Sequence, residues 1–106
     1  MPNAAGPTFR FTSPLWEHTE NMSGWFFITV PVDESEAIRA ITDGHERRGF
    51  GSVKVEAEIG PCRWSTSIFP DNQSPGFVLP VKKEVRTKAG ITDGDDVKVA
   101  LTIVGL

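Results

Sequence analysis

The chain has 106 residues, of which 39% are hydrophobic and 24% are charged, and its formal net charge is −3. A chain of this length and composition forms one folded domain, which excludes an intrinsically disordered protein, and its acidic balance argues against a surface built as a whole for nucleic acid. No apolar run approaches the length of a membrane span and the N-terminal residues lack the pattern of a secretory signal, so we predict a cytoplasmic protein.

Two strand patterns occupy the first third of the chain. Residues 1–7 are small and polar and are predicted to be a flexible tail, followed by a single domain over 8–106. Residues 8–18 begin with alternating side chains, which predicts a strand, and Pro14 marks a bend, a bulge or an edge in it. Residues 25–30 are apolar on both faces, which indicates a strand covered by a barrel interior and by a helix or a partner chain.

A first helix is predicted near residues 33–43. Asp33 is placed as its N-cap, with Glu36 three residues on as the capping-box partner. Gly44 suits the C′ position that ends a helix. The apolar face of this segment is narrow, so we expect the helix to pack against the sheet and not to build the core.

The clearest strand pattern lies in the middle of the chain. Residues 53–59 alternate apolar with charged side chains, which is typical of a strand with one solvated face. Gly60 and Pro61 turn the chain, and residues 62–69 return as the second strand of a hairpin. A short strand over 77–79 follows a loop of turn-forming residues.

The remaining residues complete a mostly β chain of about six strands. A short helix is predicted near 82–89, ended by Gly90, and a final alternating strand over 97–103 follows it. Because short strands leave long edges open unless the sheet closes, we predict a small closed or split β-barrel with two helices. An open α+β sheet is the alternative.

Several segments resemble a known family. They read RWSTSIFP over 63–70 and GFVLPVKKEVR over 76–86, and the likeness extends to WFFITVP over 25–31, GFGSVKV over 49–55 and GITDGDDV over 90–97. In order and spacing these segments are similar to the bacterial domain-of-unknown-function family 1905. The resemblance implies a double-split β-barrel, distantly similar to the barrels of AbrB-type transcription factors. It carries over no catalytic residue.

The strand over 62–69 has an unusual polar face. Alternation places Arg63, Ser65, Ser67 and Phe69 on one side of the strand. The other side is formed by Cys62, Trp64, Thr66 and Ile68. A cation and two hydroxyls in a row can donate hydrogen bonds to an anionic or carboxylated ligand. The alternative is an ordinary solvated face whose hydroxyl residues suit a strand.

The short helix supplies a second group of donors. Lys82 and Arg86 are four residues apart and share one face, next to the free N–H groups of the first helical turn. They predict an anion site whose other wall is Arg63 and the serine face. The alternative is a solvated helix with a Glu84–Lys88 ion pair.

Other residues were considered as ligands or catalysts. Trp64 combines an apolar ring with an N–H donor and is the tryptophan predicted to line a ligand pocket, with core packing as the alternative. His18 and His45 lie far apart in the chain, and Cys62 has no histidine nearby and is predicted to be a buried thiol. The aspartates around Gly94 form a tight turn and not a calcium loop. Residues 48–55 match an RNA-binding octamer only in part, without its base-stacking rings.

Two hypotheses about function follow. The first is a non-enzymatic binding module for an anionic small molecule, with no catalytic residue, metal or cofactor, acting as a monomer or a homodimer. The residues predicted to hold the ligand are Arg63, Trp64, Ser65, Ser67, Lys82 and Arg86. The second is a dimeric regulatory or interaction protein linked to DNA by analogy with AbrB-type barrels, which the net charge disfavours. A hydrolase would need a general base that the sequence does not provide.

Overall fold

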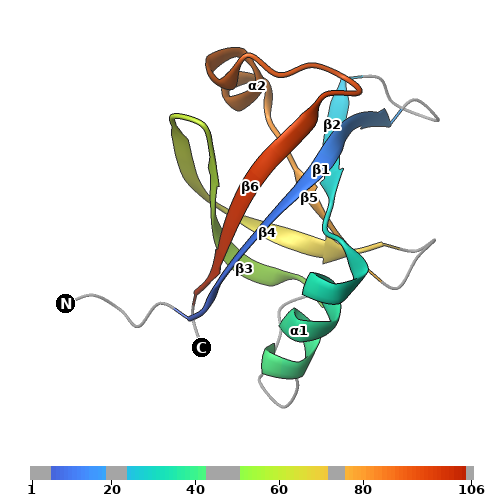
Figure 1. Cartoon of the computed structure of the whole chain (residues 1–106), viewed down its shortest axis with the longest axis vertical. Helices are drawn as coiled ribbons and strands as arrows, with labels where there is room; N and C mark the ends of the chain where they lie inside the picture. The colour runs from blue at the N-terminus through green and yellow to red at the C-terminus, as the bar shows by residue number, and fades with distance from the viewer. Residues whose placement is uncertain (1–5, 19–23, 43–50, 72–75, 105–106) are drawn as a thin grey trace.

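The computed structural model shows a closed antiparallel barrel of six strands with two helices, which confirms the predicted fold class (Figure 1). The structure describes residues 6–18, 24–42, 51–71 and 76–104. Around the barrel the strands are ordered β1-β2-β5-β4-β3-β6. In chain order the elements are β1 (Thr8–His18), β2 (Trp25–Thr29), α1 (Val32–Thr42), β3 (Val53–Ile59), β4 (Cys62–Pro70), β5 (Phe77–Pro80), α2 (Lys83–Ala89) and β6 (Asp96–Ile103).

The first strand belongs to two ladders. Up to Pro14 it pairs with β6, and from Leu15 onward it pairs with β2. Pro14, which the sequence marks as a bend, a bulge or an edge, therefore lies where the strand changes partners. The Ser13 hydroxyl donates a hydrogen bond of 2.8 Å to the Thr29 carbonyl, which ties β1 to the end of β2 at this change.

Alternating side chains build the core, as the sequence predicts for β3 and β6. Every second residue of each strand points inward and is removed from water. The buried set is completed by apolar residues of the other strands and of the helices. The largest fully buried side chains are Phe77, Leu15, Ile28, Ile38, Ile68, Leu79, Leu101 and Ile103.

Aromatic side chains of the neighbouring strand lie on the outer face of β2, which the sequence predicts to be covered by a helix or a partner chain. Phe27 on this face packs against Trp16 of β1, with ring centroids 5.2 Å apart. Trp25 lies nearly parallel to Phe27 at 6.4 Å and is 50% exposed. Within the described residues, aromatic rings of the neighbouring strand cover this face in part.

The first helix begins one residue earlier than predicted, and the predicted capping box is wrong. Its first turn is closed by a hydrogen bond of 2.8 Å from the Ser35 N–H to the Pro31 carbonyl. Pro31 therefore occupies the capping position, and Asp33 lies inside the first turn of the helix. Gly44, the predicted end of the helix, lies outside the described residues.

A buried serine joins this helix to β5. The Ser35 hydroxyl donates to the Val30 carbonyl at 3.1 Å and accepts from the Phe77 N–H at 3.2 Å. Gly76 runs so close that a Cβ there would lie 3.1 Å from both the Ser35 hydroxyl and the Val30 carbonyl oxygen. Only glycine fits at this crossing without a shift in its neighbours.

The second helix spans Lys83–Ala89, with Lys82 just before it and Gly90 in the left-handed conformation (φ 69°) at its end. This confirms the predicted helix end. Val85 is the buried residue of α2, and its carbonyl accepts a weak hydrogen bond from the Cys62 thiol at 3.9 Å. The helix thereby covers the start of β4, and Cys62 is the buried thiol that the sequence predicts.

The β3–β4 hairpin is only half joined to the barrel. Its two strands pair with each other along their length, from the Ile59–Cys62 pair at the turn to the Val53–Ile68 pair. By contrast, β4 pairs with β5 only at Phe69 and Pro70, and β3 pairs with β6 from Val55 to Glu58. After the Glu58–Ala100 pair, the turn of the hairpin stands away from β6 (Figure 1).

The chain before β1 runs beside the end of β6. The Gly6 N–H donates to the Ile103 carbonyl at 2.6 Å, and the Ile103 N–H donates to the Pro7 carbonyl at 3.1 Å. Residues 1–5 of the predicted tail lie outside the described residues. Of the helices in the described part of the chain, none has the length and apolar character needed to cross a membrane.

Candidate binding site

A cleft of about 550 Å³ opens where β4 diverges from β5. One wall is formed by Trp64, Ser65 and Thr66 of β4. The opposite wall is formed by the start of β2, by the end of β5 and by the first residues of α2. The cleft therefore exists because two neighbouring barrel strands separate after two residue pairs.

Arg86 is held in a defined orientation in this cleft. Its guanidinium carbon lies 3.8 Å from the centroid of the Phe26 ring, which is a close cation–π contact. Its Nε donates to the Val81 carbonyl at 3.3 Å, and the Val81 N–H in turn donates to the Phe26 carbonyl at 2.9 Å. No described residue forms an ion pair or hydrogen bond with the two terminal nitrogens of Arg86.

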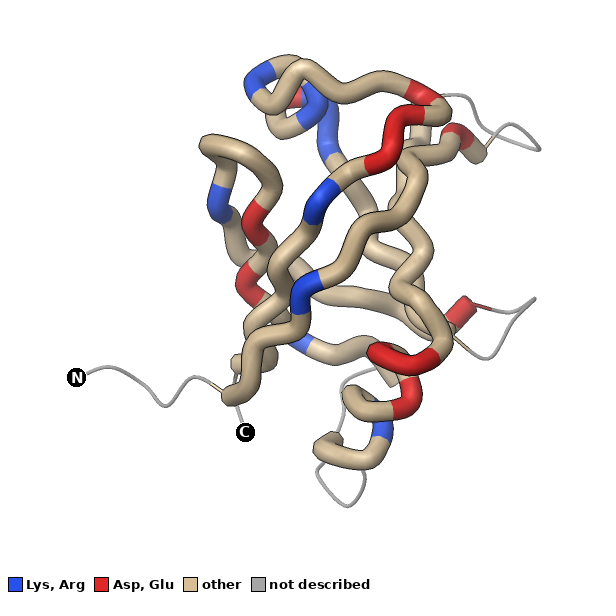
Figure 2. The backbone as a smooth tube through the Cα atoms, viewed as in Figure 1, with Lys and Arg blue, Asp and Glu red and all other residues tan. Residues whose placement is uncertain are grey.

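Two lysines extend the positive charge at the cleft. Lys82 and Lys83 line it together with Arg86, and none of the described lining residues is acidic. Basic residues gather at α2 in Figure 2. The Glu84–Lys88 ion pair of the alternative interpretation is not formed, and the Glu84 carboxylate lies 3.8 Å from the Lys82 amino group instead. Both side chains are well exposed, so this contact neutralises Lys82 only weakly.

The facing wall combines an indole ring with hydroxyls. Trp64 is half-buried and lies on the inward side of β4, as its alternation with Cys62 predicts. Ser65 points outward and is exposed, and Thr66 is half-buried. The Trp64 ring N–H has no hydrogen-bond partner among the described residues, so this wall offers an apolar surface with one free donor.

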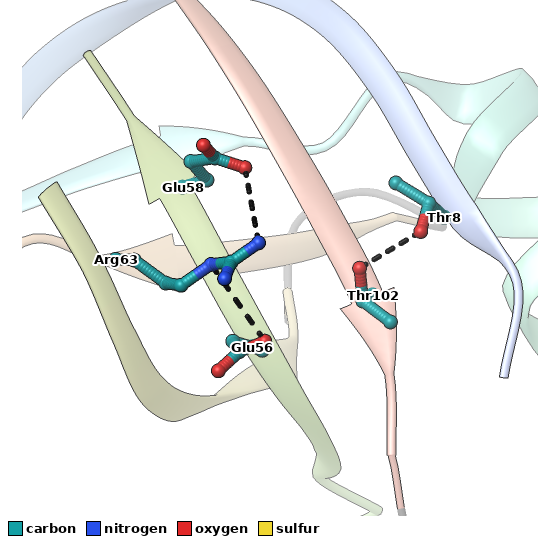
Figure 3. A network of polar contacts seen from close by, with 5 residues as sticks. All are labelled: Thr8, Glu56, Glu58, Arg63 and Thr102. Atoms are coloured by element: carbon teal, nitrogen blue, oxygen red, sulfur yellow. Dashed lines mark hydrogen bonds and ion pairs between the residues drawn. The ribbon is translucent and has the colours of Figure 1, made fainter. Parts of the chain in front are cut away.

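Arg63 lies outside this cleft. Figure 3 shows its guanidinium over β3 between Glu56 and Glu58, with each carboxylate 3.9 Å away. It lines an adjoining cavity of about 240 Å³, which shares Trp64 and Lys82 with the cleft. Ser67 lines neither space. Four of the predicted residues therefore meet in the cleft, namely Trp64, Ser65, Lys82 and Arg86.

The sequence analysis missed the residues that position Arg86. Phe26 supplies the ring beneath the guanidinium and Val81 supplies the acceptor for Nε. The position of Phe26 two residues before the inward-facing Ile28 indicates its side of β2. No local pattern shows that the Arg86 side chain reaches that strand, because the contact joins residues sixty positions apart in the chain.

No group of three or more metal-ligating side chains occurs in the described segments. The aspartate turn is confirmed: Asp95 accepts from the Thr92 N–H at 2.9 Å and Asp93 from the Glu17 N–H at 2.9 Å. His18 packs edge-on against Trp16. His45 lies outside the described residues, as does the first part of the RNA-binding-like octamer.

Comparison with known proteins adds one finding. A family model described as a domain of unknown function (DUF1905) matches residues 11–101. The match includes every strand of the barrel in whole or in part, both helices and all residues named in the cleft. No curated protein matches the chain.

Proposed function

The chain belongs to the DUF1905 family of domains of unknown function, and we propose that it is a non-enzymatic binding module for a small anion with an apolar body. The ligand would occupy the cleft between β4 and the β2–β5–α2 wall. The observation that carries the proposal is the fixed orientation of Arg86, whose guanidinium is held by Phe26 and Val81. None of the described residues that line the cleft is acidic.

Arg86 is suited to bind a carboxylate or a phosphate. A flexible arginine loses side-chain freedom when it binds, whereas this guanidinium is already fixed by its ring contact and its Nε hydrogen bond. Its terminal nitrogens remain available as a two-pronged donor, which matches the paired oxygens of such anions. Lys82 and Lys83 add positive potential that raises the local concentration of anions at low salt.

The rest of the cleft favours an apolar body on the same ligand. Trp25, Trp64 and Pro80 contribute apolar surface to its lining. Ligand sites commonly combine such apolar walls with a few convergent polar groups. We assign no catalytic residue, because the described lining contains no histidine, cysteine or carboxylate beside its hydroxyl and amino groups, which are those of Ser65, Thr66, Lys82 and Lys83.

Titration of tryptophan fluorescence tests the proposal, since two of the three tryptophans line the cleft. The probes are benzoate, indole-3-acetate and phenyl phosphate, each with a neutral amide or alcohol of the same body. We expect at least one anion to bind and its neutral counterpart to bind at least about tenfold more weakly. Arg86→Met, which retains contact with Phe26, should weaken the anion by about tenfold or more.

Arg63→Met is the matched control, because it removes an arginine that lines the adjoining cavity and lies outside the cleft. It should leave the affinity for the anion within about twofold. Thermal melts of both variants establish that they are folded. The proposal fails if no anion binds, or if Arg63→Met and Arg86→Met weaken binding equally.

A further inference from the structure

The unpaired edge of β4 indicates which class of anion the cleft binds. We infer that the anion is the C-terminal carboxylate of a short extended peptide, whose main chain pairs with β4 while its carboxylate meets Arg86. This inference rests on the proposed function of the same cleft. It goes beyond it by naming the ligand class and the main-chain groups that recognise it.

The pairing of the hairpin shows which groups of β4 face the cleft side. Gly60 and Pro61 form a two-residue turn, so the flanking pair Ile59–Cys62 exchanges both main-chain hydrogen bonds. Bonded pairs then recur at every second residue along the ladder. Trp64 and Thr66 therefore bond to β3, whereas the N–H and C=O groups of residues 63, 65 and 67 point to the opposite edge.

The far end of β4 has the same parity. The Asp71 N–H donates to the Gly76 carbonyl at 2.9 Å, so odd-numbered residues of this segment face β5. Strand pairing on that side stops at Phe69. No described strand pairs with β4 on this side between Cys62 and Ile68. The main-chain groups of Ser65 and Ser67 are consequently presented to an added strand.

The opposite wall explains why the barrel leaves this edge open. β5 ends at Pro80, which is paired with Phe27 of β2 and has no N–H to offer β4. Beyond Pro80 the chain turns into α2, which contacts β4 through Val85 and Cys62 at the start of the strand. The stretch around Ser65 is thereby left between two covered ends.

The charges fix which end of a peptide would lie near α2. A bound strand presents one carboxylate, at its C-terminus, and one amine, at its N-terminus. Lys82, Lys83 and Arg86 line the α2 side, and no described acidic residue lines the cleft to pair with an amine. A peptide that adds as a strand to the edge of β4 would pair with its free main-chain groups, and its terminal carboxylate would meet the basic residues on the α2 side.

Selection from a library of N-acetylated tripeptides with free C-termini and all three positions randomised tests the inference. The best peptide is then compared by calorimetry with its C-terminal amide and with a form N-methylated at the middle residue. We expect the free acid to bind and each altered form to lose about tenfold or more. In Arg86→Met, the acid and the amide should bind within about twofold of each other.

The outcomes separate this inference from the proposed function. If no selected peptide depends on both its carboxylate and its main-chain N–H groups, the peptide class is overturned. Should phenyl phosphate or another small anion still bind through Arg86, the proposed function stands. Failure of the small anions and the peptides together would overturn both.

Discussion

Replacing Phe77 by alanine is expected to lower the free energy of unfolding by about 3–5 kcal/mol. The ring is 0% exposed and is the largest fully buried side chain described in the barrel. Arg39 of α1 also lies over it, with its guanidinium carbon 5.1 Å from the ring centroid. Truncation removes this apolar contact area and leaves a cavity that the surrounding strands can fill only in part. Urea unfolding followed by circular dichroism measures the loss.

Phe69→Ala is the matched control for this prediction. Phe69 pairs with Val78 of β5 just as its neighbour Pro70 pairs with Phe77, but its side chain is 40% exposed on the outer face. Its loss should cost about 1 kcal/mol or less, because most exposed substitutions change stability little. Equal losses for the two variants would contradict the described packing of the barrel interior.

Ser35→Ala is expected to lower the free energy of unfolding by about 1–3 kcal/mol, although it removes only one oxygen atom. That oxygen donates to the Val30 carbonyl and accepts from the Phe77 N–H, at a position that is 0% exposed. Alanine leaves the Phe77 N–H without its acceptor in a dry environment, where the lost hydrogen bond is not replaced by water. The same unfolding experiment gives the magnitude.

The matched control here is Ser65→Ala, which removes an exposed hydroxyl from β4. It should change stability by no more than about 0.5 kcal/mol. A Ser35→Ala protein as stable as Ser65→Ala would show that the hydroxyl does not join α1 to β5.

The strands and their faces were predictable because their signal is local. Alternation over 53–59 and 97–103 repeats every second residue, and the same residues turn out to be buried. Gly90 was predictable as a helix end for a similar reason, since its positive φ is a property of a single residue. These features need no knowledge of the rest of the chain.

The start of the first helix shows where local signals compete. Asp33 has the side chain of an N-cap, yet the helical hydrogen bonds begin at the Pro31 carbonyl. The helix begins at Val32, directly after Pro31, and this places Asp33 in the first turn. An acidic side chain is favourable there as well as at the N-cap. Composition alone does not decide between these two positions for Asp33.

The environment of Arg63 could have been predicted from the sequence by working out which residues face each other across the hairpin. A two-residue turn at Gly60 and Pro61 places Glu58 directly opposite Arg63. Opposite charges at such a pair attract one another, which assigns Arg63 to the outer face of the hairpin and not to the anion site.

The separation of β4 from β5 could not be obtained in this way. The separation depends on where β5 ends, which is at Pro80, and on the path that the chain then takes into α2. The contact of Arg86 with Phe26 depends on the same path. The candidate site is therefore a product of chain topology, while its basic residues alone are visible in the sequence.

The central claim is that the cleft between β4 and α2 binds an anion through Arg86. The most direct measurement is a nuclear magnetic resonance titration of the ¹⁵N-labelled protein with the tightest anion of the panel. We predict the largest shifts at the Arg86 Nε–H and at the amides of Ser65, Thr66 and Lys82, which line the cleft. Shifts confined to the Arg63 face of the hairpin, with the Arg86 Nε–H unmoved at saturation, would contradict the claim.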